Sequence, residues 1–253
     1  MKKAFALLLL PAMAMLTACT PATTPDQSAQ SSQTTASISI QSNQTMQSSD
    51  TNSLSQATTM ATPPPANNPG QDPQLLPPQP ADTVAIMETD FGTIKFRLFT
   101  QDVPTLTTNF IQLAQQNKYN GTPFHRVVKD FMIQGGDFEN RDGTGGYSYK
   151  GPGTFLANEI NPAYHHLYGT VSMAKTSDPV SIGSQFFIVT NKDGVPSLDG
   201  GYSPIGQVYS GMDVAEKIQN LQTPGTEQPS QLISLKKVII TTYADDQAGK
   251  VKG

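Results

Sequence analysis

The chain has 253 residues, a formal net charge of −4 and charged residues at only 14% of its positions. This mildly acidic balance, with its charges scattered along the chain, argues against a protein that binds nucleic acid through a basic surface. Cys19 is the only cysteine, so an intramolecular disulfide is excluded.

Residues 1–18 have the anatomy of a secretory signal, with two lysines after the first methionine and then an apolar run too short for a transmembrane helix. The motif LTAC at residues 16–19 resembles the lipobox of bacterial lipoproteins. This resemblance implies that the leader is cut before Cys19 and that Cys19 is acylated. Loss of Lys2 and Lys3 with the leader takes the net charge from −4 to −6. A plain signal peptide with a chance cysteine is the alternative.

The lipobox resemblance also implies a location. Several acyl chains on one residue anchor a protein stably, whereas a single chain binds a bilayer only marginally. We therefore expect an exported protein that is held to the lipid bilayer of the cell envelope through acylated Cys19. Thr20 follows the cysteine where an aspartate would alter sorting, which favours the outer membrane, facing the periplasm.

The next segment, residues 19–81, is predicted to be a disordered tether. It consists mainly of Ser, Thr, Gln, Asn, Ala and Pro, with no lysine or arginine between Lys3 and Lys95 and no aromatic residue between Phe5 and Phe91. Such a composition buries too little apolar surface to offset the entropy of ordering. Prolines stiffen its C-terminal end. A proline-rich recognition ligand is the weaker alternative, because spacers of this kind are far commoner.

A folded domain is predicted at residues 82–245, followed by a flexible tail at residues 246–253. Alternating apolar residues predict a β-hairpin from 83–89 and 93–99, and helical spacing predicts a helix that begins at Pro104 and another at residues 212–220. Further strands are expected at residues 124–128, 132–134, 169–174, 183–190, 205–208 and 235–243. Many strands without a βαβ rhythm favour a closed antiparallel barrel with helical plugs.

Residues 121–138, GTPFHRVVKDFMIQGGDF, combine an arginine, large apolar side chains and an amide. Strict alternation along a strand places Phe124, Arg126 and Val128 on one face, and Met132 and Gln134 on one face beyond the break at residues 129–130. A permanently charged guanidinium beside an apolar patch and an amide is unusual for a core strand. This stretch is therefore the candidate functional site.

Four segments resemble, in order and spacing, the cyclophilin family of peptidyl-prolyl cis–trans isomerases. They are residues 124–138, GTGG at 143–146, GSQFFI at 183–188, and LDG at 198–200 with Gly206 beyond. The resemblance covers residues 83–243. It implies a mainly β fold, a closed eight-stranded antiparallel barrel capped by two α-helices. It also implies rotation about X-Pro bonds of proline-containing polypeptide clients, such as unfolded or exported proteins, without a cofactor or metal.

The resemblance assigns roles to individual residues. Arg126 matches the catalytic arginine. The substrate-binding positions comprise a proline pocket of Phe131, Met132, Phe187 and Leu198, two polar groups beside it, Gln134 and Gln185, a backbone contact at Ala174, and Tyr202 where many members carry histidine.

Three departures from the family pattern alter what is expected of the site. Ile205 replaces a usual pocket phenylalanine, which implies a roomier or less aromatic floor. Ser197 falls where animal members carry a tryptophan that contacts cyclosporin, so tight binding of that drug is not expected. Lys175-Thr176 replaces a common Asn-Ala beside the peptide groove.

Other chemistries are weakly supported. The glycines at 143–146 lack the following helix of a phosphate-binding loop, no Gly-x-Ser-x-Gly elbow is present, and adjacent His165 and His166 near Glu159 rarely converge on one metal ion. Two functional alternatives stay open beside the enzyme. One is a low-turnover proline-peptide binding module or chaperone on the cell envelope, and the other is a structural envelope lipoprotein.

Overall fold

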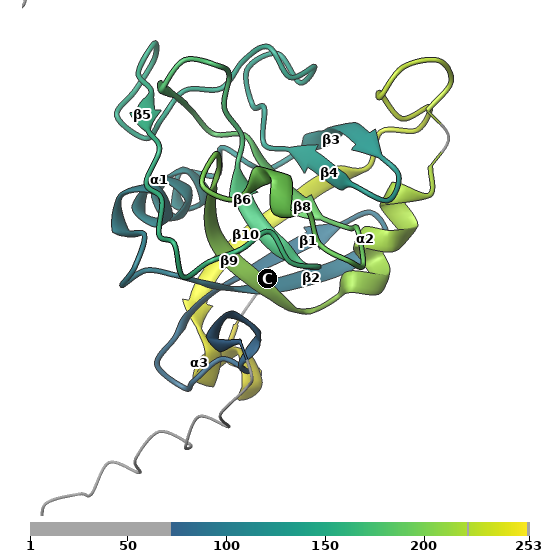
Figure 1. The fold of residues 1–253 in the computed structure, drawn as a ribbon. Coiled ribbons are helices and arrows are strands. Elements are labelled where there is room, and N and C mark those ends of the chain that lie inside the picture. Colours follow the sequence, from purple (N-terminus) through teal and green to yellow (C-terminus); the bar gives the residue numbers. More distant parts are fainter. Residues whose placement is uncertain (1–71, 222, 252–253) are drawn as a thin grey trace, which may run out of the picture. The chain divides into compact units, whose positions relative to one another are not determined.

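A computed structural model describes residues 72–221 and 223–251. The predicted leader, Cys19 and the predicted tether up to residue 71 lie outside the described residues. Eight strands form a closed barrel in the order β1-β10-β3-β4-β8-β6-β9-β2, and all neighbours are antiparallel (Figure 1). The strands are β1 (Thr83–Thr89), β2 (Gly92–Leu98), β3 (Thr122–Val128), β4 (Met132–Gly135), β6 (Thr170–Met173), β8 (Phe186–Val189), β9 (Ser203–Ser210) and β10 (Ser234–Thr242). The predicted fold class is confirmed.

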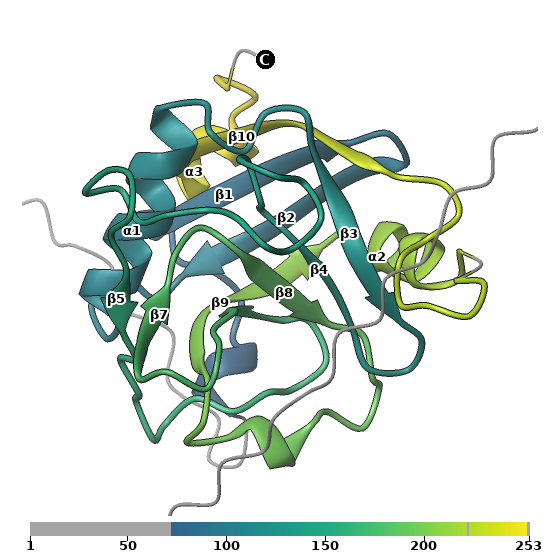
Figure 2. The same cartoon turned by 90° about the horizontal axis from the view of Figure 1, so that it is seen from above.

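The two predicted helices lie on opposite sides of the barrel, as both cartoon views show (Figures 1 and 2). They are α1 (Pro104–Gln115) and α2 (Met212–Gln219). The structure also has a short α3 (Tyr243–Gln247), two 3₁₀ turns, η1 (Pro73–Leu75) and η2 (Pro196–Leu198), and a small sheet of β5 (Leu156–Ala157) and β7 (Val180–Ile182). The sequence patterns did not predict these five short elements.

Aromatic side chains pack the end of the barrel that α1 covers. Phe110 of α1 stacks on Tyr119 at 4.8 Å between ring centroids and meets Phe186 of β8 edge-on at 5.6 Å. All three side chains are fully buried, and each such burial contributes about 1.5–3 kcal/mol to stability. This core gives the strands around the site a rigid backing.

Alternation along β4 and β8 separates the barrel core from a second apolar cluster. Ile133 and Ile188 belong to the core, whereas Met132 and Phe187, their strand neighbours, belong to the second cluster. Because adjacent side chains on a strand point to opposite faces, this second cluster lies on the outer face of the barrel. It is built where β4 and β8 pair.

The predicted tether is wrong over residues 72–81, which fold onto the barrel. Gln74 is fully buried, and its side-chain amide donates to the carbonyl of His165 at 2.9 Å, Oγ1 of Thr170 at 2.7 Å and Oε1 of Gln207 at 3.0 Å. The amide oxygen accepts the backbone N–H of His165 at 2.9 Å. Composition indicated disorder because the segment lacks apolar periodicity, but polar contacts supply the attachment. Besides the side chain of Gln74, Nη2 of Arg97 donates to the carbonyls of Pro73 and Gln74 at 3.1 Å each.

The predicted flexible tail also begins too early. Helix α3 includes Asp246, whose carboxylate accepts from Nζ of Lys95 at 2.6 Å and from the hydroxyl of Tyr209 at 3.1 Å. Thr242 caps this helix by accepting the backbone N–H of Asp245 at 3.2 Å. Among residues 72–221 and 223–251, no helix has the length and apolar character needed to cross a membrane.

Candidate functional site

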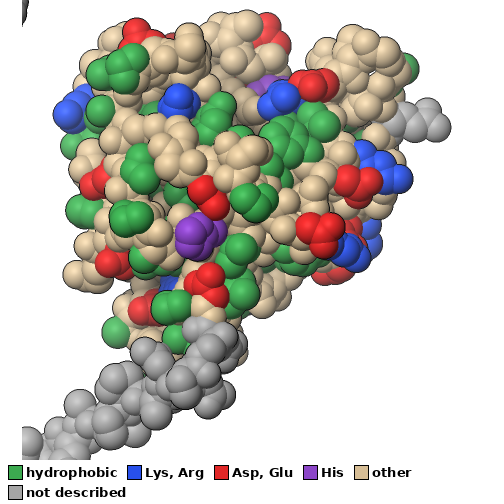
Figure 3. Space-filling view, in the orientation of Figure 1, with side chains coloured by type: hydrophobic (Ala, Val, Ile, Leu, Met, Phe, Trp, Pro, Cys, Tyr) green, Lys and Arg blue, Asp and Glu red, His purple; other side chains and the backbone are tan. Residues whose placement is uncertain are grey.

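A small hollow of about 100 Å³ opens on the outer face of β4 and β8. Its wall consists of Arg126, Phe131, Met132, Gln134, Ala174, Lys175, Phe187, Leu198 and Tyr202. Figure 3 shows apolar side chains gathered over this part of the barrel, with basic and acidic side chains at their edge. Eight of the predicted site residues therefore meet in one place.

Strand pairing explains why residues distant in sequence meet here. Arg126 of β3 lies opposite Gln134 of β4, Gln134 lies opposite Phe187 of β8, and Phe187 lies opposite Ser172 of β6. Side chains directly opposite one another in antiparallel strands are close neighbours. A single row across four strands thus runs from the guanidinium of Arg126 through the amide of Gln134 to Phe187. Phe187 and Tyr202 together form the aromatic wall of the hollow.

A β-bulge at His125 aims Arg126 at this row. The register between β3 and β4 shifts between Phe124, which pairs with Gly135, and Arg126, which pairs with Gln134. Phe124 consequently belongs to the barrel core while Arg126 lines the outer hollow. The prediction that these two residues share a face was wrong, because strict alternation fails where one residue is inserted into a strand.

The guanidinium of Arg126 is held from two sides. Its Nε donates to the carboxylate of Glu227, and its Nη1 donates to Oε1 of Gln134 at 3.3 Å and lies 4.0 Å from the sulfur of Met132. The side chain of Arg126 is 37% exposed, so its remaining donors are open to a ligand in the hollow. The hydrogen bond from Arg126 holds the pKa of Glu227 below its ordinary value, so Glu227 is ionised at neutral pH.

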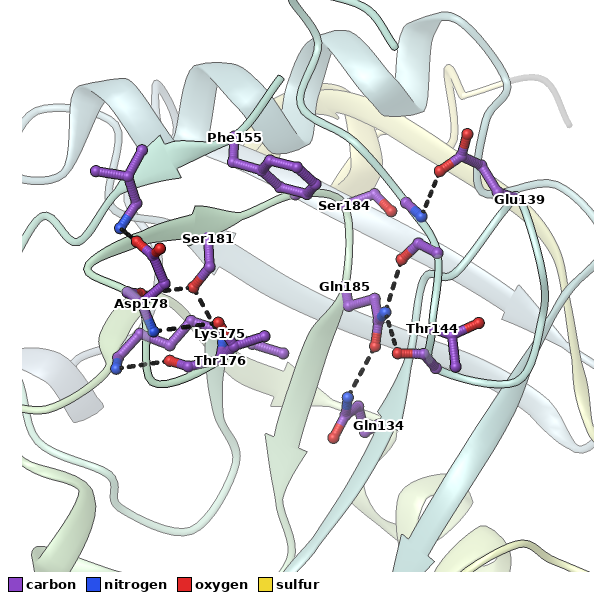
Figure 4. A pocket seen from close by; sticks show the side chains of 16 residues that line it. Gln134, Glu139, Thr144, Phe155, Lys175, Thr176, Asp178, Ser181, Ser184 and Gln185 are labelled. Carbon is purple, nitrogen blue, oxygen red and sulfur yellow. Dashed lines mark hydrogen bonds between the residues drawn. The ribbon is translucent and has the colours of Figure 1, made fainter. Parts of the chain in front are cut away.

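Gln185 supports this arrangement from behind. It accepts from Nε2 of Gln134 at 2.9 Å and donates to the carbonyls of Gly143 and Gly145 at 2.9 and 2.7 Å. Gln185 lines a second, larger hollow of about 440 Å³, shown in Figure 4, which adjoins the first through Gln134 and Ala174. Gln185 therefore lies beside the small hollow and fixes the amide that contacts Arg126.

The aromatic wall rests on a buried histidine. The ring of His166 lies parallel to Phe187 at 5.9 Å, and Tyr202 meets Phe187 edge-on at 5.7 Å. Nδ1 of His166 bonds to Asp199 at 2.8 Å and Nε2 to the hydroxyl of Ser172 at 3.1 Å. Burial lowers the pKa of His166, so the ring is neutral at pH 7 and fixes the wall through hydrogen bonds.

Ile205 is not part of the hollow. It is fully buried and belongs to the barrel core, together with Phe96 of β2 and Val171 of β6. Its side chain points inward from β9, whereas Tyr202, which precedes that strand, reaches the outer cluster. The prediction that Ile205 forms the pocket floor was wrong, and the residue shapes the core behind the site.

The model of the cyclophilin type peptidyl-prolyl cis-trans isomerase family matches residues 84–240. The chain belongs to this family. It is 37% identical over 172 residues to a peptidyl-prolyl cis-trans isomerase of Acinetobacter baylyi, which covers 64% of this chain and 89% of that protein. It is 35% identical over 161 residues to peptidyl-prolyl cis-trans isomerase A of Dickeya dadantii, and this match covers 62% of this chain and 82% of that protein. The enzyme class predicted from the sequence is thereby confirmed.

Solved cyclophilin structures agree with the fold. A crystal structure of a Cryptosporidium parvum cyclophilin type isomerase is 31% identical, covers 64% of this chain and 98% of that one, and superposes with a TM-score of 0.60. A second crystal structure of that isomerase was determined in the presence of the dipeptide Ala-Pro. It is 32% identical, covers 63% of this chain and 99% of that one, and has a TM-score of 0.59.

Two residues of this cyclophilin-type site were not predicted to belong to it. Nζ of Lys175 lies 5.1 Å from the ring centroid of Tyr202 and lines the hollow, although the sequence marked it only as a departure from the family pattern. Glu227 lies 101 positions from Arg126 in the chain, in a segment without periodic pattern, so no sequence signal indicated the contact.

The residues that suggested a metal have other partners. Both His165 and His166 bond to Asp199, and Glu159 accepts the backbone amides of Thr105 and Leu106 at the start of α1 at 3.2 and 2.9 Å. Within the part of the chain that the structure describes, no group of three or more His, Cys, Asp or Glu side chains is placed to hold a metal ion.

Proposed function

We propose that the chain rotates X-Pro bonds of unfolded or exported proteins by holding the proline ring in the small hollow while Arg126 donates to the twisted amide. One observation carries this proposal. The free donors of Arg126 share one small hollow with the apolar side chains of Met132 and Phe187, which are only 2% and 4% exposed. A hollow of this size with an apolar wall beside a fixed cation suits a small ring attached to a polar peptide bond.

The reaction needs few groups from the protein. Rotation about the peptide bond is opposed by lost amide resonance of about 18–20 kcal/mol, and no bond to carbon is broken. X-Pro bonds prefer trans by only about 0.5–1 kcal/mol, yet they exchange over tens to hundreds of seconds. A protein that stabilises the twisted amide therefore accelerates both directions without a nucleophile, metal or general base.

Arg126 suits the role of donor because its charge is independent of pH and its five donors form a rigid fork. In the twisted amide the prolyl nitrogen becomes pyramidal and gains a lone pair that the planar ground state lacks. A hydrogen bond from Arg126 to that nitrogen forms only on the way to the transition state, so it lowers the barrier and not merely the energy of binding. Gln134, bonded to Arg126, keeps the donor in place.

The proposal is tested by replacing Arg126 with alanine in the full-length chain and following a short Ala-Pro peptide in a protease-coupled assay. We expect a loss of most activity with an unchanged far-UV circular dichroism spectrum. Arg141→Ala, which removes an exposed arginine outside the hollow, is the matched control and should retain full activity. Near-normal turnover of a folded Arg126→Ala protein would overturn the assignment.

The alternative is a module that binds proline peptides with little turnover. It predicts that micromolar wild-type protein retains labelled Ala-Pro peptide without accelerating its isomerisation. The pairing of a free guanidinium with the hollow favours the enzyme, because binding of an apolar ring alone requires no cation.

We further propose that Cys19 is acylated and that the segment after it tethers the isomerase domain to the cell envelope, in the outer membrane and facing the periplasm. The motif LTAC at residues 16–19, the apolar leader and the composition of residues 20–71 support this proposal. Incorporation of labelled palmitate should be abolished by Cys19→Ala and unaffected by Thr20→Ala. Equal labelling of Cys19→Ala would remove the anchor.

A further inference from the structure

The acidic side chain that contacts Arg126 belongs to the segment between α2 and β10. Glu227 contacts β3 twice: its carboxylate accepts from Nε of Arg126, and its backbone carbonyl accepts the N–H of Val127 at 2.7 Å. The backbone bond fastens this segment to β3 whatever the side chain at position 227 is. The carboxylate is therefore free to have a second role, which concerns the guanidinium.

The donors of Arg126 divide between this carboxylate and the hollow. Glu227 takes the single donor at Nε, and Gln134 takes one at Nη1. Among residues 72–221 and 223–251, nothing accepts a hydrogen bond from Nη2. Since a guanidinium has five donors, the two at Nη2 remain for a substrate, whereas the second at Nη1 faces the sulfur of Met132 at 4.0 Å. Glu227 thus occupies the edge of the guanidinium that the proposed reaction does not need.

We propose that Glu227 is a positioning residue, which holds Arg126 by Nε so that its Nη edge stays turned toward the hollow. This inference rests on the proposed function of Arg126. An arginine side chain without such a partner samples several rotamers, and the reacting geometry is then present for only part of the time. Glu227 and Gln134 together fix the plane of the guanidinium from two directions.

The expected loss of kcat on removing Glu227 follows from how exposed the ion pair with Arg126 is. The side chains of Arg126 and Glu227 are 37% and 56% exposed, and ion pairs open to solvent order their partners only modestly. We expect Glu227→Ala to lower kcat by about three- to tenfold, a range that corresponds to a modest change in the barrier. KM should change by less than about twofold, because the walls that hold the proline ring are untouched.

The test measures kcat and KM separately for the full-length chain on an Ala-Pro peptide. Glu227→Ala should lose kcat, and Glu227→Gln, which keeps an oxygen acceptor without the charge, should fall between it and the wild type. Asp213→Asn, at another exposed carboxylate that pairs with Lys217 on α2, is the matched control and should match the wild type. The thermal midpoint of all variants should stay within about 2 °C, since the backbone bond of Glu227 persists.

A double-mutant cycle separates this inference from the proposed function. In an Arg126→Ala background, Glu227→Ala should have no further effect on kcat. If Arg126→Ala keeps full activity, the proposed role of Arg126 fails. If Arg126→Ala is inactive while Glu227→Ala equals the wild type, only the positioning role fails. A Glu227→Ala protein that is faster than the wild type would overturn the inference by showing that Glu227 obstructs Arg126.

Discussion

Replacing Gln74 with alanine should destabilise the domain, although this residue precedes the first barrel strand. Its side chain is fully buried and bonds to the backbone N–H and carbonyl of His165 and to the side chains of Thr170 and Gln207. Thr170 retains bonds to His165 and Gln207 in the variant, so the main loss is at the N–H of His165.

Leaving one buried polar group without a partner costs about 1–3 kcal/mol, and loss of the packed side chain adds to this. We therefore expect Gln74→Ala to lower the free energy of unfolding by about 3 kcal/mol. For a domain of this size, that loss lowers the thermal midpoint by about 6–12 °C.

The chain has no tryptophan, so unfolding is followed by far-UV circular dichroism in urea and on heating. Gln79→Ala is the matched control, because that side chain makes a single exposed bond to the carbonyl of Pro77 at 3.3 Å. A loss below about 0.5 kcal/mol for Gln74→Ala, equal to that of the control, would refute the conclusion that residues 72–81 belong to the folded domain.

Three further predictions concern the core, the wall of the hollow and pH. Ile205→Phe should cost about 1–3 kcal/mol of stability by overpacking the core and leave KM unchanged; a changed KM in a stable protein would return Ile205 to the pocket. Phe187→Leu should lower kcat/KM for cis–trans exchange of a proline peptide about tenfold. This corresponds to a loss of about 1.4 kcal/mol of transition-state stabilisation. Burial lowers the folded-state pKa of His125 and His166. As the pH falls, the unfolded chain therefore takes up protons at these two residues before the folded chain does. The urea midpoint of the wild type should therefore fall as the pH drops from 7 through about 6.5. The midpoint of His166→Gln should fall less steeply with pH, and equal slopes for the two proteins would contradict this reasoning.

The strands of the barrel were predictable because their alternation is local. Lys95 and Arg97 alternate with Ile94, Phe96 and Leu98, and the structure has β2 there. The helices were predictable for the same reason, since Pro104 opens a helix whose buried residues recur at helical spacing. Residues of the hollow were found through a family resemblance. Strand register brings together the four that lie on strands, which are Arg126, Met132, Gln134 and Phe187.

What the sequence did not predict depends on contacts between distant segments. The bulge at His125 reverses the facing of Phe124, and a pattern of period two cannot indicate where a residue is inserted. Gln74 is 133 positions from Gln207, and Glu227 is 101 from Arg126. Each of these polar contacts is a single pair with no repeating pattern, so only the folded arrangement reveals it.

The most direct test of the central claim is exchange NMR on a proline peptide with the full-length protein at a small fraction of the peptide concentration. Catalysis through Arg126 predicts that the cis–trans exchange rate rises while the cis population stays constant, because a catalyst accelerates both directions equally. Arg126→Ala should return the rate toward its uncatalysed value. Wild-type protein that leaves the rate unchanged, while an equimolar amount shifts the cis population, would contradict the account and identify a binding module.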